Sequence, residues 1–313
     1  MAFFVLRRAG SALLLLLVVS ALSFTLLSIP DLDVGRQLLG PGADQELVDA
    51  RNTALGLDRP VVVRYLDWLL SAVRGDLGTS WFTGEDVSRA IGNRLPVTLS
   101  LMVGVTLVTA VASFGLGVWA GVRRGFVDRI VQVVGVVGYA LPGFLVTLVI
   151  VLVFAVQLRW FPAIGYIPLS RSVGGWLSTV TLPVLSLSIA SVAGVSQQVR
   201  SSVIEVLGRD HVRTLRARGL PAGRVVFRHV LRSAATPALT VLGLQFVGLL
   251  GGAVLVEQIF GLPGIGAMTV QYTTRGDVPV IMGLVMMTVI GVVVINLLVD
   301  VLVGWLDPKA RLA

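Results

Sequence analysis

The chain has 313 residues, of which 55% are hydrophobic and 13% charged, and its mean hydropathy of +0.90 lies outside the range of soluble globular proteins. The absence of cysteine excludes disulfides and cysteine-ligated zinc, and the net charge of +8 comes from arginine with a single lysine, Lys309. This composition predicts an all-α, multi-pass membrane protein.

Six apolar runs are long enough to cross a bilayer, whose hydrocarbon core of roughly 30 Å needs about 20 residues of helix. They are residues 9–29, 97–122, 130–157, 180–199, 237–259 and 279–303. Prolines at 96, 183, 237 and 279 are expected in the opening turns of their helices, where a missing N–H costs little. Pro142 falls inside the third run and should kink or divide that helix, either as a packing feature or as a gating hinge.

Arginine is concentrated in alternate loops. Residues 123–129 carry three arginines and residues 200–236 carry eight, whereas the intervening short loops carry one or two. By the positive-inside rule, both termini, residues 1–8 and 304–313, are predicted to be cytoplasmic. The first run could instead be a cleaved signal, but it is longer than a signal core and no convincing cleavage site follows, which favours an anchor helix.

Residues 30–96 form the one large external segment in this topology. They hold ten acidic residues and seven arginines, and turn-forming sequences stand at 57–60 and 75–78. The pattern predicts a small folded cap of short amphipathic helices, with residues 97–303 forming the core of the protein.

Motifs for catalysis are missing from this sequence. A GxxxxGK[ST] loop needs a lysine beside its glycines, and residues 261–266, which are rich in glycine, follow no predicted strand. His211 and His229 lack a metal-ligand pattern, and Glu257 and Asp300 are the only ionisable residues in the predicted spans. We therefore expect no enzymatic activity and no cofactor, metal or nucleic acid bound by this chain.

Two basic helical patterns follow the fourth run. Arg209, Arg213 and Arg216 share one stripe at 100° per residue, and a second set of arginines follows at intervals of four after residue 221. Gly219 between them is placed as a left-handed helix cap. The pattern predicts a helix, a sharp turn and a helix facing the cytoplasm, although a basic loop resting on anionic lipid would have the same charge.

This segment resembles the cytoplasmic coupling motif of ABC importer permeases, in the form used by the dipeptide, oligopeptide and nickel permease family. Aligned on Gly219, Arg213 takes the place of the motif's Glu, Thr214 and Leu215 take the places of its two Ala, and residues 231–232 take that of its Leu-Pro. Leu215 departs from the small residue of the general motif. The residues that the resemblance implies for ATPase coupling are Arg209, Asp210, Arg213, Thr214, Leu215, Arg216, Ala217, Arg218, Gly219, Leu220, Arg228 and His229.

The resemblance covers nearly the whole chain. Residues 55–60 with 75–78, 94–99, 257–266 and 296–308 are similar to the first, or B-type, permease subunit of that family. It implies a type I ABC importer permease fold in a bacterial inner or plasma membrane. It also implies three kinds of partner besides membrane lipid: a second permease, two ATPase subunits that bind ATP and magnesium, and an extracytoplasmic solute-binding protein.

The resemblance leaves the cargo open among a dipeptide, a longer peptide, glutathione, a nickel chelate and haem. A stand-alone secondary transporter is the alternative from another class, and it predicts inverted repeats and buried coupling charges, which the sequence lacks. A scaffold or membrane enzyme is a third alternative. The predicted helix-packing or gating residues are Gly117, Gly121, Pro142, Gly248, Gly252, Glu257 and Asp300.

Overall fold

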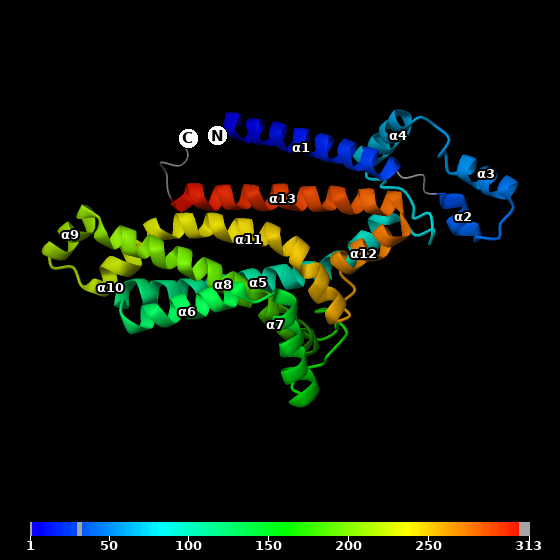
Figure 1. The fold of residues 1–313 in the computed structure, drawn as a ribbon. Helices are drawn as coiled ribbons and strands as arrows, with labels where there is room; N and C mark the ends of the chain where they lie inside the picture. The colour runs from blue at the N-terminus through cyan, green and yellow to red at the C-terminus, as the bar shows by residue number, and fades with distance from the viewer. Residues whose placement is uncertain (1, 30–32, 307–313) are drawn as a thin grey trace. The chain divides into compact units, whose positions relative to one another are not determined.

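The computed structural model describes residues 2–29 and 33–306, and the regular secondary structure of this part of the chain is helical, apart from one isolated bridge between Thr79 and Asp86 (Figure 1). The predicted all-α class is therefore confirmed. The helices are α1 (Ala2–Ser28), α2 (Val34–Leu39), α3 (Gln45–Ala54), α4 (Val61–Val73), α5 (Val87–Arg123), α6 (Phe126–Ala140), α7 (Gly143–Ile150), α8 (Val173–Gly208), α9 (Asp210–Ala217), α10 (Ala222–Val225), α11 (Leu231–Ile259), α12 (Ile265–Arg275) and α13 (Val278–Leu306), with π-helical segments η1 (Val151–Gln157) and η2 (Val226–Val230).

Five helical stretches among the described residues are long and apolar enough to cross a membrane, and a bent pair supplies a sixth crossing if it is one span. The pair is α6 with α7 and η1, which meet at 98° across residues 141–142. Pro142 stands at this break as the N-cap of α7, so the predicted division of the third span is confirmed.

Most of these helices are longer than the apolar runs that marked them. α5 begins ten residues or so before its run because Val87, Ala90 and Ile91 are buried and continue the packing surface. Pro96, Pro183 and Pro237 consequently lie inside their helices, and the expectation that they occupy opening turns was wrong; only Pro279 lies in one.

The described residues divide into two compact units. The first comprises residues up to Pro96 together with 267–293, and the second comprises 97–266 with the remainder of α13. In the first unit, Phe24 of α1 packs with Val278 and Met282 of α13, and with Trp68 and Trp81 of the segment between the first two spans.

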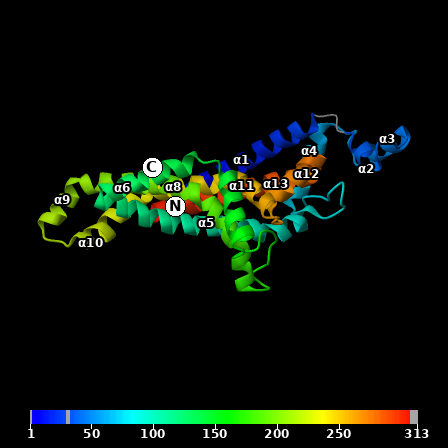
Figure 2. The ribbon, with the colours of Figure 1, turned by 60° about the horizontal axis from the view of Figure 1, so that its bottom comes forward.

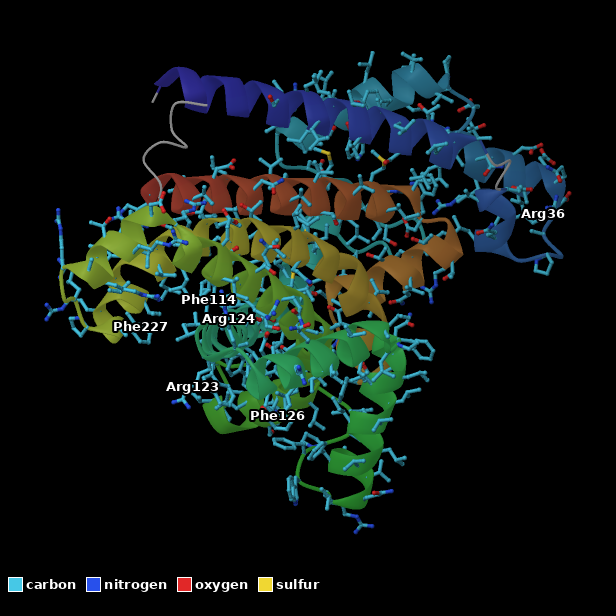
Figure 3. All side chains as sticks on the ribbon, turned by 60° about the vertical axis from the view of Figure 1, so that its left-hand side comes forward. Arg36, Phe114, Arg123, Arg124, Phe126 and Phe227 are labelled. Carbon is cyan, nitrogen blue, oxygen red and sulfur yellow. The ribbon has the colours of Figure 1, made fainter. Side chains whose placement is uncertain are left out.

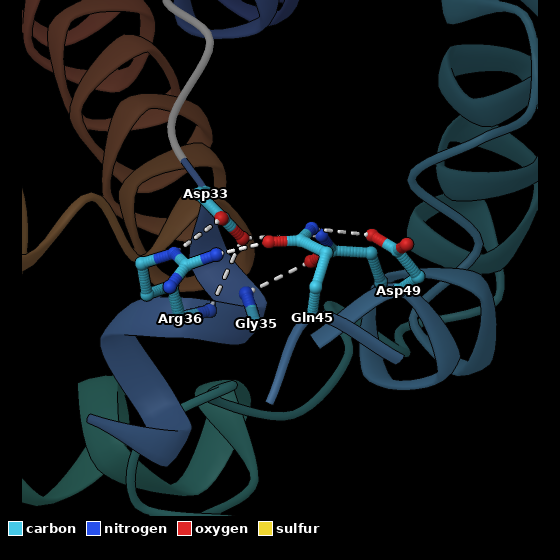
Figure 4. Close-up of polar contacts among 6 residues, drawn as sticks. Asp33, Gly35, Arg36, Gln45 and Asp49 are labelled. Carbon is cyan, nitrogen blue, oxygen red and sulfur yellow. Dashed lines mark hydrogen bonds and ion pairs between the residues drawn. The ribbon is translucent and has the colours of Figure 1, made fainter. Parts of the chain in front are cut away.

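Side-chain hydrogen bonds hold α2 against α3 (Figure 4). Asp33 caps α2 by accepting from the backbone N–H of Arg36 at 3.1 Å, and the backbone N–H of Gly35 donates to the Asn52 side chain at 2.8 Å. Arg36 also bonds Gln45. The Arg36 N–H bond, followed by the Asn52 bond, lowers the pKa of Asp33 below its ordinary value, so this cap stays ionised.

In the second unit, α8 is the central helix and packs against α6, α7 and α11 (Figures 1 and 2). One apolar cluster joins α5, α8, α11 and the segment around Phe260, and another joins α8, α9, η2 and α11. The second cluster lies beneath the predicted coupling residues.

Candidate functional site

The predicted coupling segment is carried at the end of two long helices. α8 continues from Arg200 to Gly208 beyond its predicted span, about 13 Å of helix at 1.5 Å per residue, and α10 with η2 lengthens α11 on the return side. α9 and α10 lie side by side at this end of α8 and α11 in both views (Figures 1 and 2). The segment is therefore a projecting helical turn and not a loose loop.

Buried valines hold the projecting turn together. Val212 of α9, Val225 of α10 and Val230 of η2 have no exposed surface and pack with Val199 and Val203 of α8. Fully burying one such side chain is worth about 1.5–3 kcal/mol, so this small core fixes α9 against the two long helices. A turn with its own core does not need a lipid surface to keep its shape.

Gly219 ends α9 in the predicted left-handed conformation, with φ +75°. The N–H of Leu220 donates to the carbonyl of Leu215 at 3.3 Å, and the N–H of Gly219 donates to that of Arg216 at 2.9 Å. This pair of bonds is the Schellman motif. Leu215 and Leu220 both pack against the apolar cluster beneath the turn, which explains why a large residue stands where the general motif has a small one.

The basic side chains of the turn point outward. Arg213 pairs with Asp210 at 3.5 Å with both side chains mostly exposed, and Arg209 pairs with Glu205 at 2.7 Å in the same setting. Exposed pairs of this kind are worth at most about 1 kcal/mol, so they do not prevent the arginines from meeting a partner. Thr214, Ala217 and the predicted arginines at 216, 218 and 228 are also exposed, as is His211, while His229 is half-buried.

An aromatic residue that the sequence did not single out stands among these charges. Phe227 is 72% exposed, and it borders a groove of about 450 Å³ between α10 with η2 and the end of α5, which includes Phe114 and Arg123. Figure 3 shows these residues gathered at the same end of the unit. The spacing of the valines at 225, 226 and 230 in the sequence marks one buried face of a helix, and it could have indicated that Phe227 points away from that face.

The loop of residues 123–129 lies at the same end as the turn. Asp128 at the start of α6 forms an ion pair with Arg200 of α8, with one N···O distance of 2.7 Å, and both side chains are largely covered. The two loops predicted to be cytoplasmic from their charge are thus joined directly.

The two glycine pairs differ in their surroundings. An added methyl at Gly117 would lie 2.7 Å from the Val199 Cβ, and one at Gly121 would lie 2.9 Å from a Val203 methyl, so this pair brings α5 against α8. Gly248 has no atom within 4 Å of the same position, and Gly252 only Leu187 at 3.8 Å. Intrachain packing accounts for the first pair only.

Glu257 is fully buried at the turn between α11 and α12. The Thr98 hydroxyl donates to its carboxylate at 2.6 Å and accepts from the N–H of Ile265 at 2.8 Å. An added methyl at Gly264 would lie 2.2 Å from the Glu257 carboxyl carbon. Gly264 and Gly266 therefore make room for a carboxyl group of the chain itself, which explains these two glycines without a nucleotide. Asp300 is half-buried on α13.

Asp277, which the sequence did not indicate, joins the start of α13 to the segment before α5 in the first unit. It is fully buried just before α13 and accepts from the Ser80 hydroxyl at 2.6 Å and from the Trp81 N–H at 3.3 Å. An Asp followed two residues later by Pro279 is a helix-start signal that could have found it.

An apolar groove of about 680 Å³ runs between α5, α6 and α8. Its described lining consists of aliphatic residues and Trp119, with Ser188 and Ser196 as hydroxyl groups. Such a wall offers dispersion contacts and two weak hydrogen-bonding groups to whatever faces it.

Two family models match this chain. The one described as binding-protein-dependent transport system inner membrane component matches residues 113–312, and the one for the N-terminal part of such components matches residues 1–102. Among curated relatives, the oligopeptide transport system permease protein AppB of Bacillus subtilis is 35% identical over 99% of both chains. The glutathione transport system permease protein GsiC of Salmonella choleraesuis is 33% identical over 98% of both.

A solved structure of the MetNI methionine ABC transporter in inward-facing conformations is similar to this fold. The match has a TM-score of 0.58 at 16% identity and covers 69% of this chain and 96% of that one. At this identity the likeness concerns the fold alone.

Proposed function

Since this chain belongs to the family of binding-protein-dependent transport system inner membrane components, we propose that it forms half of the translocation pore of an ATP-driven peptide importer. The family makes it an ABC importer permease subunit with the type I permease fold and not a stand-alone secondary transporter. Peptide cargo is supported by the relatives named for oligopeptide and glutathione transport.

The projecting turn carries the proposed coupling to an ATPase. Its apolar core lies inside and its arginines and Phe227 lie outside, on a helix pair that extends past the predicted membrane boundary. Interfaces are commonly anchored by an aromatic side chain and arginines. Closure of the ATPase pair would push on α9, and the small core would transmit that push to α8 and α11, which rock between two states.

The remaining partners follow from the same proposal. ATP and magnesium bind to the ATPase subunits, a second permease completes the pore, and an extracytoplasmic solute-binding protein delivers the cargo. This chain contributes no catalytic residue; its lack of a GxxxxGK[ST] sequence supports that division of labour.

The proposed orientation places both termini and the turn on the cytoplasmic side of the membrane, and the segment of α2 to α4 on its outer side. Single cysteines can be introduced freely into this cysteine-free chain. An impermeant thiol reagent added to intact cells should label Thr83→Cys and Ser172→Cys but not Arg216→Cys. The same protection is expected at Lys309, which lies outside the described residues. Labelling at position 216 would overturn the orientation.

Uptake by a strain lacking this chain tests the function. Accumulation of a labelled tripeptide should be lost and restored by the wild-type chain, while uptake of a labelled free amino acid serves as the control. Purified chain alone in liposomes should accumulate nothing under a proton or sodium gradient. Peptide uptake that survives the deletion would contradict the proposed cargo, and uphill transport by the chain alone would contradict the subunit role.

A further inference from the structure

Helix α4 has an apolar face that no described residue of its unit covers. Its residues Val62, Leu66, Leu70 and Val73 are 69%, 49%, 59% and 80% exposed. At 100° per residue they occupy one arc of about 80°, and the polar side chains of Asp67 and Ser71 lie on the far side of the helix. α4 is thus amphipathic with its apolar arc open.

A third face of α4 packs against the membrane-spanning helix α1. The Phe24 ring lies 5.6 Å from that of Tyr65 and 6.4 Å from that of Trp68, measured between centroids. The Arg64 guanidinium lies 5.7 Å from the centre of the Phe24 ring, and the Tyr65 hydroxyl is 2.9 Å from that of Ser20. The contact is therefore made by specific groups and fixes which side of α4 faces α1.

The depth of this contact indicates what surrounds α4. The first predicted span ends at Ile29, and Ser20 lies about 13 Å before it along the helix, which is close to half the thickness of a hydrocarbon core of about 30 Å. A helix whose Tyr65 reaches Ser20 lies alongside the outer half of α1. Residues of α1 on this stretch, such as Leu22 and Leu26, are exposed and apolar.

We propose that α4 is an amphipathic membrane helix that lies in the outer part of the bilayer with Val62, Leu66, Leu70 and Val73 against lipid acyl chains. α1, at Leu22 and Leu26, and α4, on its open arc, both present exposed aliphatic side chains over this stretch, as helices surrounded by acyl chains do. The polar arc, where Asp67 pairs with Arg59 at 2.7 Å, faces water and headgroups. A protein interface would be expected to centre on aromatic or arginine anchors, and the open arc consists of Val and Leu.

Site-directed spin labelling of the full chain in lipid nanodiscs tests this placement. Single cysteines at Leu66 and Leu70 would carry the label on the apolar arc, and matched cysteines at Asp67 and Ser71 would carry it on the polar arc of the same helix. Collision with oxygen, which concentrates in the hydrocarbon, is compared with collision with a water-soluble nickel chelate. The ratio of oxygen to nickel collision rates should be several-fold higher at 66 and 70 than at 67 and 71.

Reference labels calibrate these ratios. Leu14→Cys on the exposed side of α1 gives the hydrocarbon value, and Thr83→Cys gives the aqueous value. Labels at 66 and 70 that match the Thr83 reference would overturn the proposal in favour of a water-exposed face. Labels that are immobile and shielded from both reagents would overturn it in favour of a protein covering the arc.

Discussion

Two turns between helices of the second unit are stabilised by opposite kinds of buried group. The corner between α9 and α10 buries valines and exposes its arginines, whereas the corner between α11 and α12 buries the Glu257 carboxylate beneath glycines and the Thr98 hydroxyl. A buried polar group is costly unless its hydrogen bonds are complete, so the second corner tolerates little change. The first corner keeps its charges free for a partner, and its outer surface can vary without loss of the fold.

The comparison predicts the largest effect for Gly264→Ala. The added methyl would lie 2.2 Å from the Glu257 carboxyl carbon, and a fully buried carboxylate cannot move aside, so the protein should lose about 3 kcal/mol of stability or fail to fold. Gly223→Ala in the other corner is the matched control, because no atom lies within 4 Å of its added methyl. Recovery of monodisperse protein from membranes measures both. Equal recovery of the two variants would show that the turn between α11 and α12 tolerates an added methyl as well as the turn between α9 and α10 does.

Replacing the buried carboxyl group of Glu257 should have the next largest effect. Glu257→Gln keeps the size of the side chain but puts a buried NH2 donor where a carboxyl oxygen stood, and an unsatisfied buried donor costs about 1–3 kcal/mol. Asp210→Asn makes the same chemical change on an exposed side chain of α9 and should cost almost nothing. The difference in thermal midpoint between the two variants is the readout. A Glu257→Gln variant as stable as Asp210→Asn would contradict a structural role for the buried carboxyl group.

Gly219→Ala tests the backbone conformation of the turn between α9 and α10. Its added methyl meets no atom within 4 Å, as at Gly223, so the two variants differ in that only Gly219 has a positive φ. Alanine in that conformation costs about 1–2 kcal/mol, which should distort the turn while the helices in the membrane remain intact. We expect normal membrane abundance with reduced ATPase retention and reduced uptake for Gly219→Ala, and wild-type values for Gly223→Ala. Normal ATPase retention by Gly219→Ala would argue against a fixed turn as the coupling element.

The same contrast separates what the sequence could predict from what it could not. Run length predicted where helices cross the bilayer, and the glycine between two basic stripes predicted the left-handed cap at Gly219, because both signals are local. The ends of α5 and α8 were not predicted, since they depend on packing outside the hydrocarbon. Glu257 and Asp277 find their partners at Thr98 and Ser80, more than 150 positions away, and a single sequence carries no sign of such pairings.

Charge reversal on the basic corner should have the smallest effect on stability and a clear effect on assembly. Arg213 is mostly exposed, and its distance of 3.5 Å from Asp210 is that of a weak surface pair, so Arg213→Glu should change stability by no more than about 0.5 kcal/mol. At a docking surface, however, it places a negative charge where a positive one is proposed to meet the ATPase, which slows association and weakens the complex.

The measurement is pull-down of the ATPase subunits at matched membrane levels, repeated at low and high salt. Arg129→Glu, a reversal of another exposed arginine in the first turn of α6, serves as the control for the effect of net charge on the predicted cytoplasmic side. Retention should fall for Arg213→Glu and not for the control. Equal loss in both variants would mean that the ATPase responds to the overall positive charge of this end and not to the turn, and the contrast between the two corners would then concern stability alone.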